Sequence, residues 1–520
     1  MCEVCQAFSD QAMAAGEMPQ SVVIPSNSPV DSLFSGTQRT DTNISVHFAG
    51  LGQGPTVFEN TPSEGWTAYE RARVEAALTA ISNVANVTFT VTSNPDADFQ
   101  LIKSAAAFNS PNSLGYFYLP NGTGRSPGVF NSDGIGWTND GLREGGTGYA
   151  TVVHELLHGL GLGHTHDGIN VMDGVTQPFN DFGRNNLNQG IYSTMSYNSG
   201  LNGTDNANRG AEAGPMALDI AALQAIYGAN MSHATGDDVY DLDTTNSDGA
   251  AWKSIWDAGG TDTIRYNGSA DTTIDLREAT LEYETGGGGF ISSANNVSGG
   301  FTIANGAIIE NAIGGRGDDT IIGNGVNNEL SGRGGDDDIR GNEGDDTING
   351  NSGSDDLSAT SGTNLIYGGS GFDDIDGGSG RDTVYGGGGN DTIDGNNGND
   401  FLFGGRGNDT INGGGNNDQI VGGMGADDLR GGNGEDDFIF EFVSDSFAGA
   451  GNRDIIRDFQ VGEDDIDLSA IGGLNFSDDI DLNVSGGNTV VAIDVNGDGS
   501  ADMEIFVTGV TNLGENDFIL

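Results

Sequence analysis

HELLHGLGLGH, residues 154–164, is the stretch from which the fold of this chain can be read. On a helix, His154 and His158 stand four residues apart and share one face, so their imidazoles can reach one metal ion while Glu155 lies beside it. This spacing is typical of a zinc site that carries its own general base. An ordinary helix with incidental histidines is the alternative, but so many specified positions rarely coincide in one window.

The end of the same segment supplies a third ligand. Gly161 allows the chain to leave the helix in a sharp turn, which would bring His164 back toward the other two histidines. Three protein ligands leave the fourth position of a tetrahedral zinc ion open for water, and an open position is typical of a catalytic site.

A second element lies downstream, where STMSY at residues 193–197 places Met195 in a short polar segment. The extended His/Glu motif of metzincins is followed by such a methionine turn. The sequence therefore resembles a metzincin. Met195-Ser196-Tyr197, together with PMALDI at residues 215–220, resembles the serralysin branch, and the resemblance continues through the rest of the chain.

The resemblance implies a zinc endopeptidase with a defined set of roles. Zinc would polarise the scissile carbonyl and activate water, with Glu155 as the general base. By resemblance, Tyr197 ligates the resting zinc or stabilises the oxyanion, and Met195 forms an apolar floor beneath the ion. One departure is Thr165, followed by His166, where serralysins usually carry proline, and this departure concerns the floor of the substrate pocket.

Charge and composition narrow the range of partners. With 76 acidic and 19 basic residues the net charge is −57, which argues against nucleic acid or anionic membranes and favours bound calcium. Cys2 and Cys5 are the two cysteines, so a disulfide framework is not expected. Since no run of 18 apolar residues occurs, we expect no membrane insertion.

Residues 1–35 are predicted to be a leader or pro-segment. Residues 1–30 lack the basic and apolar regions of a Sec-type signal peptide. Cys2 and Cys5 either have no structural importance or supply a thiol that caps the zinc. Cleavage is expected before the first predicted strand, which begins at residue 43.

Residues 36–230 are predicted to form the α+β catalytic domain. Tyr116 and Tyr118 belong either to an edge strand that pairs with extended substrate, as the resemblance implies, or to ordinary core packing. His47, His166 and His233 lack partner spacing and are expected to be structural or solvated. The predicted strands are residues 43–49, 87–91, 99–102 and 114–119, and the predicted helices are residues 63–85 and 216–226.

Residues 231–313 are predicted to be a junction that opens a calcium-binding domain. Segments 257–262 and 306–311 resemble the serralysin segments at this point. The alternative for the glycine pair is a simple turn. By resemblance the candidate calcium ligands, which use carboxylate and backbone oxygens, are Asp257, Gly259, Gly260, Asp262 and Glu310.

Residues 314–439 form an uninterrupted array of fourteen nonapeptides on the pattern G-G-x-G-x-D-x-U-x. Position eight is always apolar, which predicts a parallel β-roll (RTX) with one inward side chain per repeat. Position six is aspartate except at Asn328 and Asn364. The predicted calcium ligands at position six are Asp319, Asp337, Asp346, Asp355, Asp373, Asp382, Asp391, Asp400, Asp409, Asp418, Asp427 and Asp436.

If one coil of the roll comprises two nonapeptides, as in the family, each ion lies between repeats n and n+2. Both asparagines fall in even repeats, at Asn328 and Asn364, and the sixth repeat also lacks its first two glycines. We therefore expect a nearly continuous odd row of calcium ions and an even row that is vacant or weak near these two residues.

Residues 440–520 are predicted to be a β cap that carries a type I secretion signal. Segments 453–459 and 464–469 have the pattern of strands. Residues 494–502 have the acidic spacing of an EF-hand loop, but a glycine-rich hairpin turn fits equally well. The chain ends on an acidic residue and an apolar triplet, similar to uncleaved type I export signals.

The sequence thus predicts an α+β metzincin catalytic domain, an all-β parallel β-roll and a carboxy-terminal β cap. The predicted function is a secreted, extracellular, monomeric zinc endopeptidase acting on proteins or peptides and exported by a type I secretion apparatus. The alternative is a calcium-binding adhesin or surface-layer protein with a vestigial protease domain. The complete set of zinc ligands and base favours the enzyme, because a binding module has no use for it.

Overall fold

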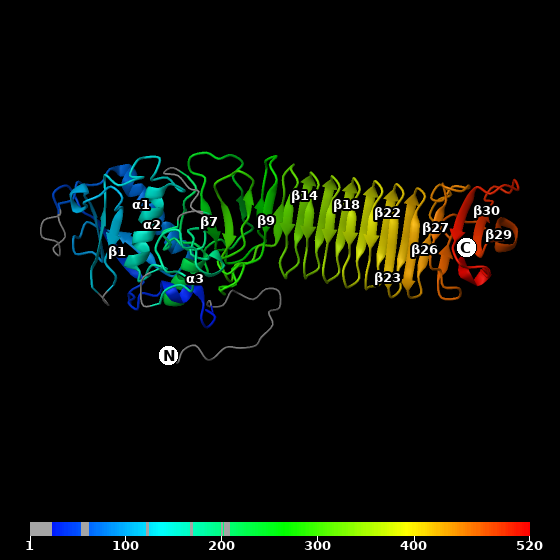
Figure 1. Cartoon of the computed structure of the whole chain (residues 1–520), viewed down its shortest axis with the longest axis horizontal. Coiled ribbons are helices and arrows are strands. Elements are labelled where there is room, and N and C mark those ends of the chain that lie inside the picture. Colours follow the sequence, from blue (N-terminus) through cyan, green and yellow to red (C-terminus); the bar gives the residue numbers. More distant parts are fainter. Residues whose placement is uncertain (1–22, 54–61, 121–123, 167–169, 199–200, 202–208) are drawn as a thin grey trace.

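The computed structural model describes residues 23–53, 62–120, 124–166, 170–198, 201 and 209–520. A mixed α/β unit is followed by a long roll of parallel strands and then by a cap (Figure 1). The carboxyl terminus lies at the opposite end of the molecule from the α/β unit. The predicted fold class is confirmed. No helix among the described residues is long and apolar enough to cross a membrane.

The α/β unit is built on one five-stranded sheet with the order β2-β1-β3-β5-β4, in which β4 alone runs antiparallel to its neighbour. β5 was not predicted, because its sequence SPGVF contains proline and glycine, which are disfavoured in strands. Of the two alternatives for the segment around Tyr116, the structure shows the edge strand, since β4 is the last strand of the sheet, and Tyr118 follows just after its end. The strands are β1 (Asn43–Phe48), β2 (Thr88–Val91), β3 (Phe99–Lys103), β4 (Gly115–Phe117) and β5 (Ser126–Phe130).

Three α-helices accompany the sheet: α1 (Ala68–Val84), α2 (Thr147–Gly159) and α3 (Ala217–Tyr227). Helix α1 begins five residues later than predicted, because a capping box sets its start. Thr67 Oγ1 accepts the Glu70 backbone N–H at 3.2 Å, and Glu70 Oε2 accepts the Thr67 N–H at 2.7 Å. Short 3-10 helices are η1 (Pro29–Leu33), η2 (Ala105–Ala107) and η3 (Arg184–Asn186).

Residues 28–35, here called the amino-terminal strap, are packed into the α/β unit. Leu33 in η1 is fully buried, and its carbonyl accepts the Gly163 N–H at 2.8 Å. Ser35 Oγ donates to Gly161 O at 2.6 Å, so the strap holds the turn that follows α2. At its other end Ser28 Oγ donates to Leu281 O at 2.6 Å. Cys2 and Cys5 lie outside the described residues.

The junction continues into the roll without a break in the sheets. Strands β6 and β8 pair in parallel with each other and β8 pairs with β12, so the even-repeat sheet already begins at residue 239. The junction strands are β6 (Val239–Asp241), β7 (Trp252–Ile255), β8 (Thr263–Arg265), β9 (Thr272–Asp275), β10 (Ser293–Ala294), β11 (Gly300–Ile303) and β12 (Asn311–Ile313).

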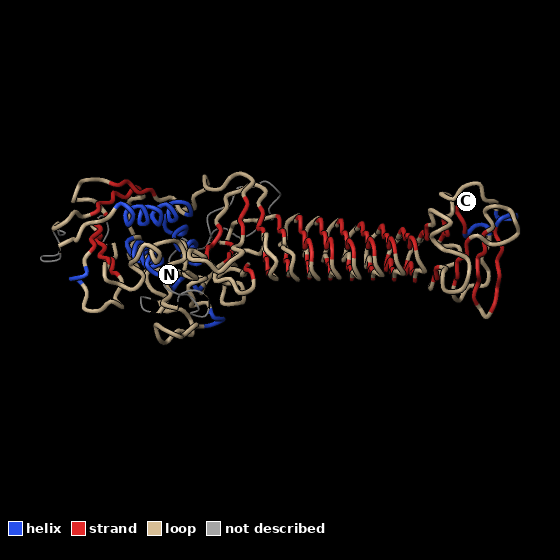
Figure 2. The backbone as a smooth tube through the Cα atoms, turned by 90° about the horizontal axis from the view of Figure 1, so that it is seen from above, coloured by secondary structure: helices blue, strands red, loops and turns tan. Residues whose placement is uncertain are grey.

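The repeats form two facing parallel sheets, one from odd and one from even repeats, which Figure 2 shows edge-on as a regular series of strands. The odd strands are β13 (Thr320–Ile322), β15 (Asp338–Arg340), β17 (Asp356–Ser358), β19 (Asp374–Asp376), β21 (Thr392–Asp394), β23 (Thr410–Gly415) and β25 (Asp428–Asn433). The even strands are β14 (Glu329–Gly334), β16 (Thr347–Ser352), β18 (Leu365–Ser370), β20 (Thr383–Gly388), β22 (Phe401–Arg406), β24 (Gln419–Met424) and β26 (Asp437–Ile439).

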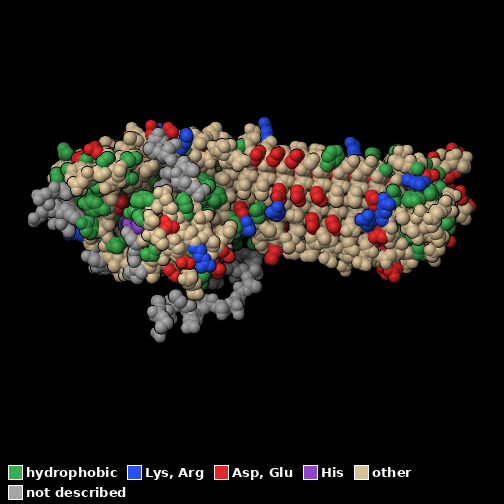
Figure 3. Space-filling model, viewed as in Figure 1, with side chains coloured by type: hydrophobic (Ala, Val, Ile, Leu, Met, Phe, Trp, Pro, Cys, Tyr) green, Lys and Arg blue, Asp and Glu red, His purple; other side chains and the backbone are tan. Residues whose placement is uncertain are grey.

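The register confirms that one coil comprises two nonapeptides. Ile321 pairs with Ile339, and Leu330 pairs with Ile348, eighteen residues apart in each case. Every position-eight side chain is at most 1% exposed, so these residues fill the space between the sheets. Acidic side chains form short rows on the outer surface of the roll (Figure 3).

The cap extends both sheets. The two predicted strands form, and an antiparallel meander of β29, β30 and β31 that was not predicted closes the odd sheet. Residues 494–502 form the hairpin loop between β30 and β31, so the predicted turn is present, while calcium binding there stays a prediction. The elements are β27 (Asp454–Ile456), β28 (Asp465–Asp467), α4 (Phe476–Asp479), β29 (Ile480–Ser485), β30 (Asn488–Ile493), β31 (Met503–Val507), η4 (Glu515–Asp517) and β32 (Phe518–Ile519).

Candidate metal centres and the cleft at the histidine cluster

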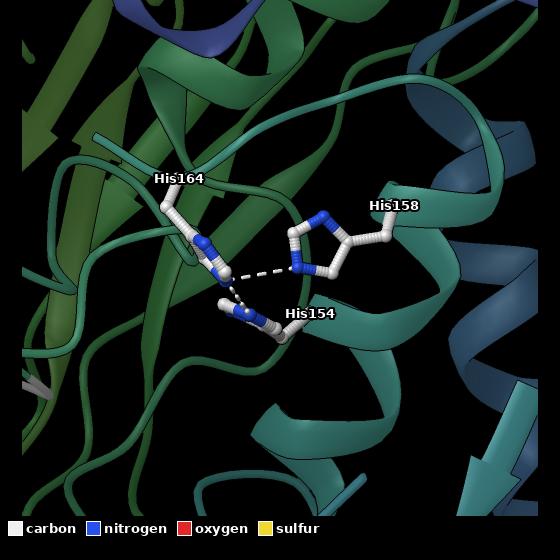
Figure 4. Close-up of side chains that lie close together, drawn as sticks. All are labelled: His154, His158 and His164. Atoms are coloured by element: carbon white, nitrogen blue, oxygen red, sulfur yellow. Dashed lines mark hydrogen bonds between the residues drawn. The ribbon is translucent and has the colours of Figure 1, made fainter. Parts of the chain in front are cut away.

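Three imidazoles converge at the carboxyl end of α2 (Figure 4). His164 Nε2 lies 3.2 Å from His154 Nε2 and 3.0 Å from His158 Nε2. The helical spacing places the first two on one face, and the chain brings the third to them from the following loop. The predicted convergence of the three histidines is confirmed.

Gly161 makes that return possible. Its φ is +103°, a conformation that L side chains rarely adopt, and a Cβ there would collide with Thr37 O. The turn closes with hydrogen bonds from Gly161 N to His158 O at 2.9 Å and from Leu162 N to Leu157 O at 3.1 Å. The strap therefore holds this turn, and the carbonyl of Thr37, just beyond the strap, requires glycine in it.

Backbone carbonyls orient two of the histidine rings. His154 Nδ1 lies 2.8 Å from Thr194 O, and His158 Nδ1 lies 2.8 Å from Leu162 O. A carbonyl oxygen only accepts hydrogen bonds, so each Nδ1 carries the proton and each Nε2 turns a lone pair toward the cluster. This is the arrangement that a metal-binding histidine requires.

Glu155 is 6% exposed, and its side chain extends from α2 toward β4. A Cβ added to Gly115 of β4 would come within 2.9 Å of Glu155 Cγ, so the edge strand passes directly beside the carboxyl group. Burial raises the pKa of Glu155 to about 8, and its Oε2 has no hydrogen-bond partner among the described residues. A buried carboxyl oxygen beside three imidazoles fits a bound cation.

Tyr197 lies on the open side of the histidines. Its hydroxyl is 3.0 Å from His164 Nε2, and the side chain is 37% exposed. The Phe179 ring stacks on it with centroids 5.3 Å apart. His166, expected to be structural or solvated, stacks on His164 at 4.9 Å and lies 4.5 Å from Tyr197, so it belongs to the surroundings of the site.

The other two histidines lie elsewhere. His47 in β1 is buried, and its Nδ1 is 3.1 Å from Thr92 O. His233 lines a small cavity against Trp256 at the junction. Neither contributes to the three-histidine cluster.

Asp219 connects α3 to the histidines, a role that sequence reasoning missed. It is fully buried and accepts hydrogen bonds from Ser193 Oγ at 2.6 Å, Thr194 N at 2.6 Å and Met216 N at 3.0 Å. Thr194 O in turn bonds His154, and Met195 is fully buried beside them. The available signal was an acidic residue inside the otherwise apolar segment PMALDI.

Replacing Asp219 by asparagine should loosen this connection. An amide keeps only one acceptor oxygen, so its N–H₂ group must face either Ser193 Oγ or the N–H groups of Thr194 and Met216. We therefore expect a loss of about 2–3 kcal/mol in the free energy of unfolding. Because Thr194 O orients His154, zinc affinity should fall about 10–100-fold. Thermal unfolding and zinc titration measure these effects, and the exposed Asp133→Asn variant is the control. Unchanged zinc affinity would contradict the positioning role.

A cleft crosses the histidine cluster along β4. On one side a cavity of about 520 Å³ is lined by Tyr116, Leu119 and Ser35 of the strap, and on the other a cavity of about 420 Å³ is lined by Phe179 and Glu212. Gly115, Glu155 and Tyr197 line both. An extended chain could therefore run past the histidines beside the edge strand.

A second candidate metal centre lies in the junction. Carboxylate oxygens of Asp238, Asp257 and Asp262 lie within 4.8 Å of one another. Asp262 is fully buried, with Oδ2 unpaired among the described residues, and burial, aided by repulsion from Asp257 and Glu310, raises its pKa to about 7. Glu310 Oε2 accepts the Asp262 N–H at 2.8 Å. Asp238 was not predicted, and the only signal was its place just before a strand.

Both glycines expected at this centre adopt positive φ, +134° at Gly259 and +151° at Gly260. A Cβ on Gly260 would collide with Gly236 O. The positive φ values explain the glycine pair as a tight backbone turn beside the carboxylates.

Buried aspartate oxygens line both edges of the roll. Typically Oδ1 accepts the backbone N–H of the position-six residue two repeats earlier, as Asp355 Oδ1 does from Asp337 at 2.9 Å, while Oδ2 has no partner among the described residues. Asp319 differs, because Gly315 N donates to its Oδ2. The unpaired Oδ2 atoms belong to Asp337, Asp346, Asp355, Asp373, Asp382, Asp391, Asp400, Asp409, Asp418, Asp427, Asp436 and Asp454.

The rows continue into the cap, which the repeat pattern did not predict. Asp454 Oδ1 accepts the Asp427 N–H at 2.9 Å, and Asp464 Oδ1 accepts the Asp436 N–H at 3.2 Å. These steps span 27 and 28 residues instead of 18, so they fall outside the periodicity. Rows of buried, unpaired carboxylate oxygens fit the ligand chemistry of calcium.

The fold and these sites define a class of metalloprotein in which an α/β unit with a three-histidine centre precedes a parallel β-roll. The chain belongs to the family Peptidase M10 serralysin C terminal, which matches residues 217–520.

Relatives include metallopeptidase AprA of Pseudomonas marginalis, 32% identical over 256 residues, or 45% of this chain and 51% of the relative. Serralysin C of Dickeya chrysanthemi is 34% identical over 253 residues, with coverage of 45% and 51%. Serralysin of Proteus mirabilis is 30% identical over 270 residues, with coverage of 46% and 53%. The chain spans about half the length of the curated relatives it matches.

Among solved structures, the AlgE6R3 subunit of the Azotobacter vinelandii mannuronan C5-epimerase has a TM-score of 0.20 and 24% identity, covering 32% of this chain and 77% of that one. Extracellular lipase LipA from Serratia marcescens has a TM-score of 0.17 and 17% identity, covering 39% and 40%.

Proposed function

We propose that the chain is a secreted zinc endopeptidase that cleaves peptide bonds in extracellular proteins. The observation that carries the proposal is the convergence of the Nε2 atoms of His154, His158 and His164 beside buried Glu155. Backbone carbonyls orient the first two of these rings. Three nitrogen ligands with a neighbouring carboxyl match the chemistry of a catalytic zinc site. Relatives that carry the names metallopeptidase and serralysin support the same reaction class.

Zinc, when bound, supplies a Lewis acid that polarises a carbonyl and acidifies water. Glu155 accepts the proton of the attacking water and returns it to the leaving amine. Tyr197 places its hydroxyl where it can donate a hydrogen bond to the oxygen that gains charge, or serve as a further ligand. β4 aligns the substrate main chain, which explains a cleft that lies along an edge strand.

In the same proposal the roll and the junction bind calcium. The buried Oδ2 atoms of the two rows and the cluster of Asp257, Asp262 and Glu310 provide hard oxygen ligands, joined by Asp238. Neutralisation of these carboxylates would stabilise the folded roll, which otherwise places like charges side by side.

The experiment that tests the function is hydrolysis of an unfolded protein by the full chain after chelation, with zinc and calcium restored separately and together. We expect full activity only with both ions. Calcium alone should restore the fold without activity. Absence of turnover under every condition would instead favour a calcium-binding adhesin with a vestigial protease domain.

Export through a type I apparatus is part of the proposal. The terminal residues carry the acidic and apolar pattern, and β32 (Phe518–Ile519) pairs with β28 at the edge of the even sheet. Deleting residues 517–520 should reduce secretion by a strain that carries such an apparatus while leaving the intracellular amount unchanged.

The strap refines the expected site of pro-segment removal. Because Val30 and Leu33 are fully buried and Ser35 holds the turn before His164, residues 28–35 should remain in the active protein. We expect the mature amino terminus to lie after Met1 and before Ser28. Terminal sequencing of secreted, active protein tests this. A mature chain that began after Ser35 with full activity would contradict it, and an intact Met1 would exclude a pro-segment.

A further inference from the structure

The two asparagines that replace aspartate in the even repeats are oriented differently, and this difference bears on where the roll binds calcium. Asn328 belongs to the second repeat, residues 323–331, and Asn364 to the sixth, residues 359–367. Both are buried, at 4% and 2% exposure. By composition alone they are equivalent neutral substitutes for a carboxylate.

In an ordinary repeat, the first glycine leaves room for two oxygens. A Cβ added to Gly350 would collide with Asp355 Oδ2 of its own repeat and lie 2.7 Å from Gly368 O two repeats further on. The same pair of oxygens surrounds Gly386 and Gly404. These glycines therefore keep open the place where a carboxylate oxygen and a carbonyl oxygen converge.

The second repeat retains this arrangement. A Cβ on Gly323 would collide with Asn328 Oδ1 and would lie 2.5 Å from Gly341 O. The Asn328 N–H₂ group points the other way and donates to Glu310 O at 2.9 Å and Asn324 Oδ1 at 3.1 Å. Asn328 therefore presents an oxygen to the space between repeats two and four. We call such a space, between repeats n and n+2 of one row, a step.

In the sixth repeat the amide is turned around. Asn364 Oδ1 accepts the Asp346 N–H at 3.0 Å, which directs the N–H₂ group toward the eighth repeat. There it donates to Asp382 Oδ1 at 2.9 Å and to Gly377 O at 3.3 Å. A side-chain N–H₂ group thus occupies the place that a carboxylate or amide oxygen takes in the other repeats.

One further feature of the same step agrees. Ala359 stands where other repeats have their first glycine, so its methyl group takes the space that the glycines leave open. Tyr367 and Tyr385 then stack across this step with centroids 5.2 Å apart and an interplanar angle of 8°, and Phe403 extends the stack. Because this stack also spans the step between the eighth and tenth repeats, it stabilises neighbouring coils but does not distinguish the step at Asn364.

Resting on the proposed calcium binding, we propose that the step between the sixth and eighth repeats is closed by the Asn364 amide and the Ala359 methyl group and binds no calcium, whereas the step at Asn328 still binds one. The even row is then divided into two groups of ions. A cation at Asn364 would face an N–H₂ group and a methyl group, and neither can ligate it.

The test counts calcium in the full chain after equilibration and gel filtration. Ala359→Gly/Asn364→Asp should bind one more ion per chain than the wild type. Asn328→Asp, the matched control, should bind the same number as the wild type with higher affinity. No gain in the double variant, or a gained ion in the control, would overturn the inference. A wild-type chain without any bound calcium would overturn the proposed calcium function instead.

Anomalous scattering from wild-type crystals grown with calcium provides a measurement that does not depend on a folded variant. We expect a peak between repeats two and four and none between Asn364 and Asp382. A peak beside Asp382 on the Asn364 side would overturn the inference.

Discussion

Replacement of Glu155 by alanine or glutamine is expected to lower peptide hydrolysis by about 10²–10⁴-fold while zinc remains bound. All three histidines remain in these variants, and His154 and His158 keep their carbonyl hydrogen bonds, so the ligand set survives and only the proton acceptor is lost. His158→Ala, in contrast, should lose both zinc and activity, because one of the three ligands is removed.

The measurements are zinc content, kcat and KM on one peptide substrate. We expect the loss in kcat, because Glu155 acts on the reacting water and not on substrate alignment. The control variant Glu75→Gln removes a charge on the exposed face of α1 and should leave zinc content, kcat and KM unchanged. Near-native turnover in the Glu155 variants would refute the assigned base.

Removal of calcium is expected to unfold the roll at pH 8 but to leave it largely folded near pH 5. Without the ion, burial is the largest cause that raises the pKa of the row carboxyls, to about 9 for Asp454, 8 for Asp418 and 7 for Asp427. These groups have ordinary values near 3.8 in an unfolded chain. At pH values between the unfolded-state pKa and the raised folded-state pKa, the folded roll binds more protons than the unfolded chain. The stability of the roll therefore falls as pH rises.

Circular dichroism in the presence of a chelator measures this dependence from pH 4 to 9. The strand signal should decrease as pH rises through about 6–9 and return on addition of calcium at pH 8. Sodium chloride of equal ionic strength is the control for general charge screening, and should restore much less signal. Equal stability of the chelated protein at pH 5 and pH 8 would contradict the role of these carboxyls.

Local patterns in the sequence were sufficient for the parts of the protein that repeat or that lie within one turn of helix. The spacing of His154 and His158 and the glycine at 161 predicted the convergence at His164. The nonapeptide period predicted the paired coils and the inward residues. Such features depend on neighbours only a few residues away, so the sequence determines them directly.

Contacts between distant segments were decided only by the tertiary structure. The strap at Leu33 and Ser35, the support of Thr194 by Asp219 and the extension of the rows to Asp454 all join residues that no period relates. β5 forms despite its proline and glycine because burial between β3 and β4 outweighs intrinsic strand preference.

The two asparagines of the even row show which properties the sequence determines and which depend on the tertiary structure. The sequence determines that Asn328 and Asn364 lack a carboxylate, and it therefore predicts that the even row binds calcium more weakly. It does not determine which way each amide turns, because that depends on the partners that folding brings: Glu310 O on one side and the Asp346 N–H on the other. The Asn328 oxygen therefore faces the step between repeats two and four, whereas the Asn364 N–H₂ group faces the step between repeats six and eight. In each case the buried amide orients so that its donors and acceptor are paired.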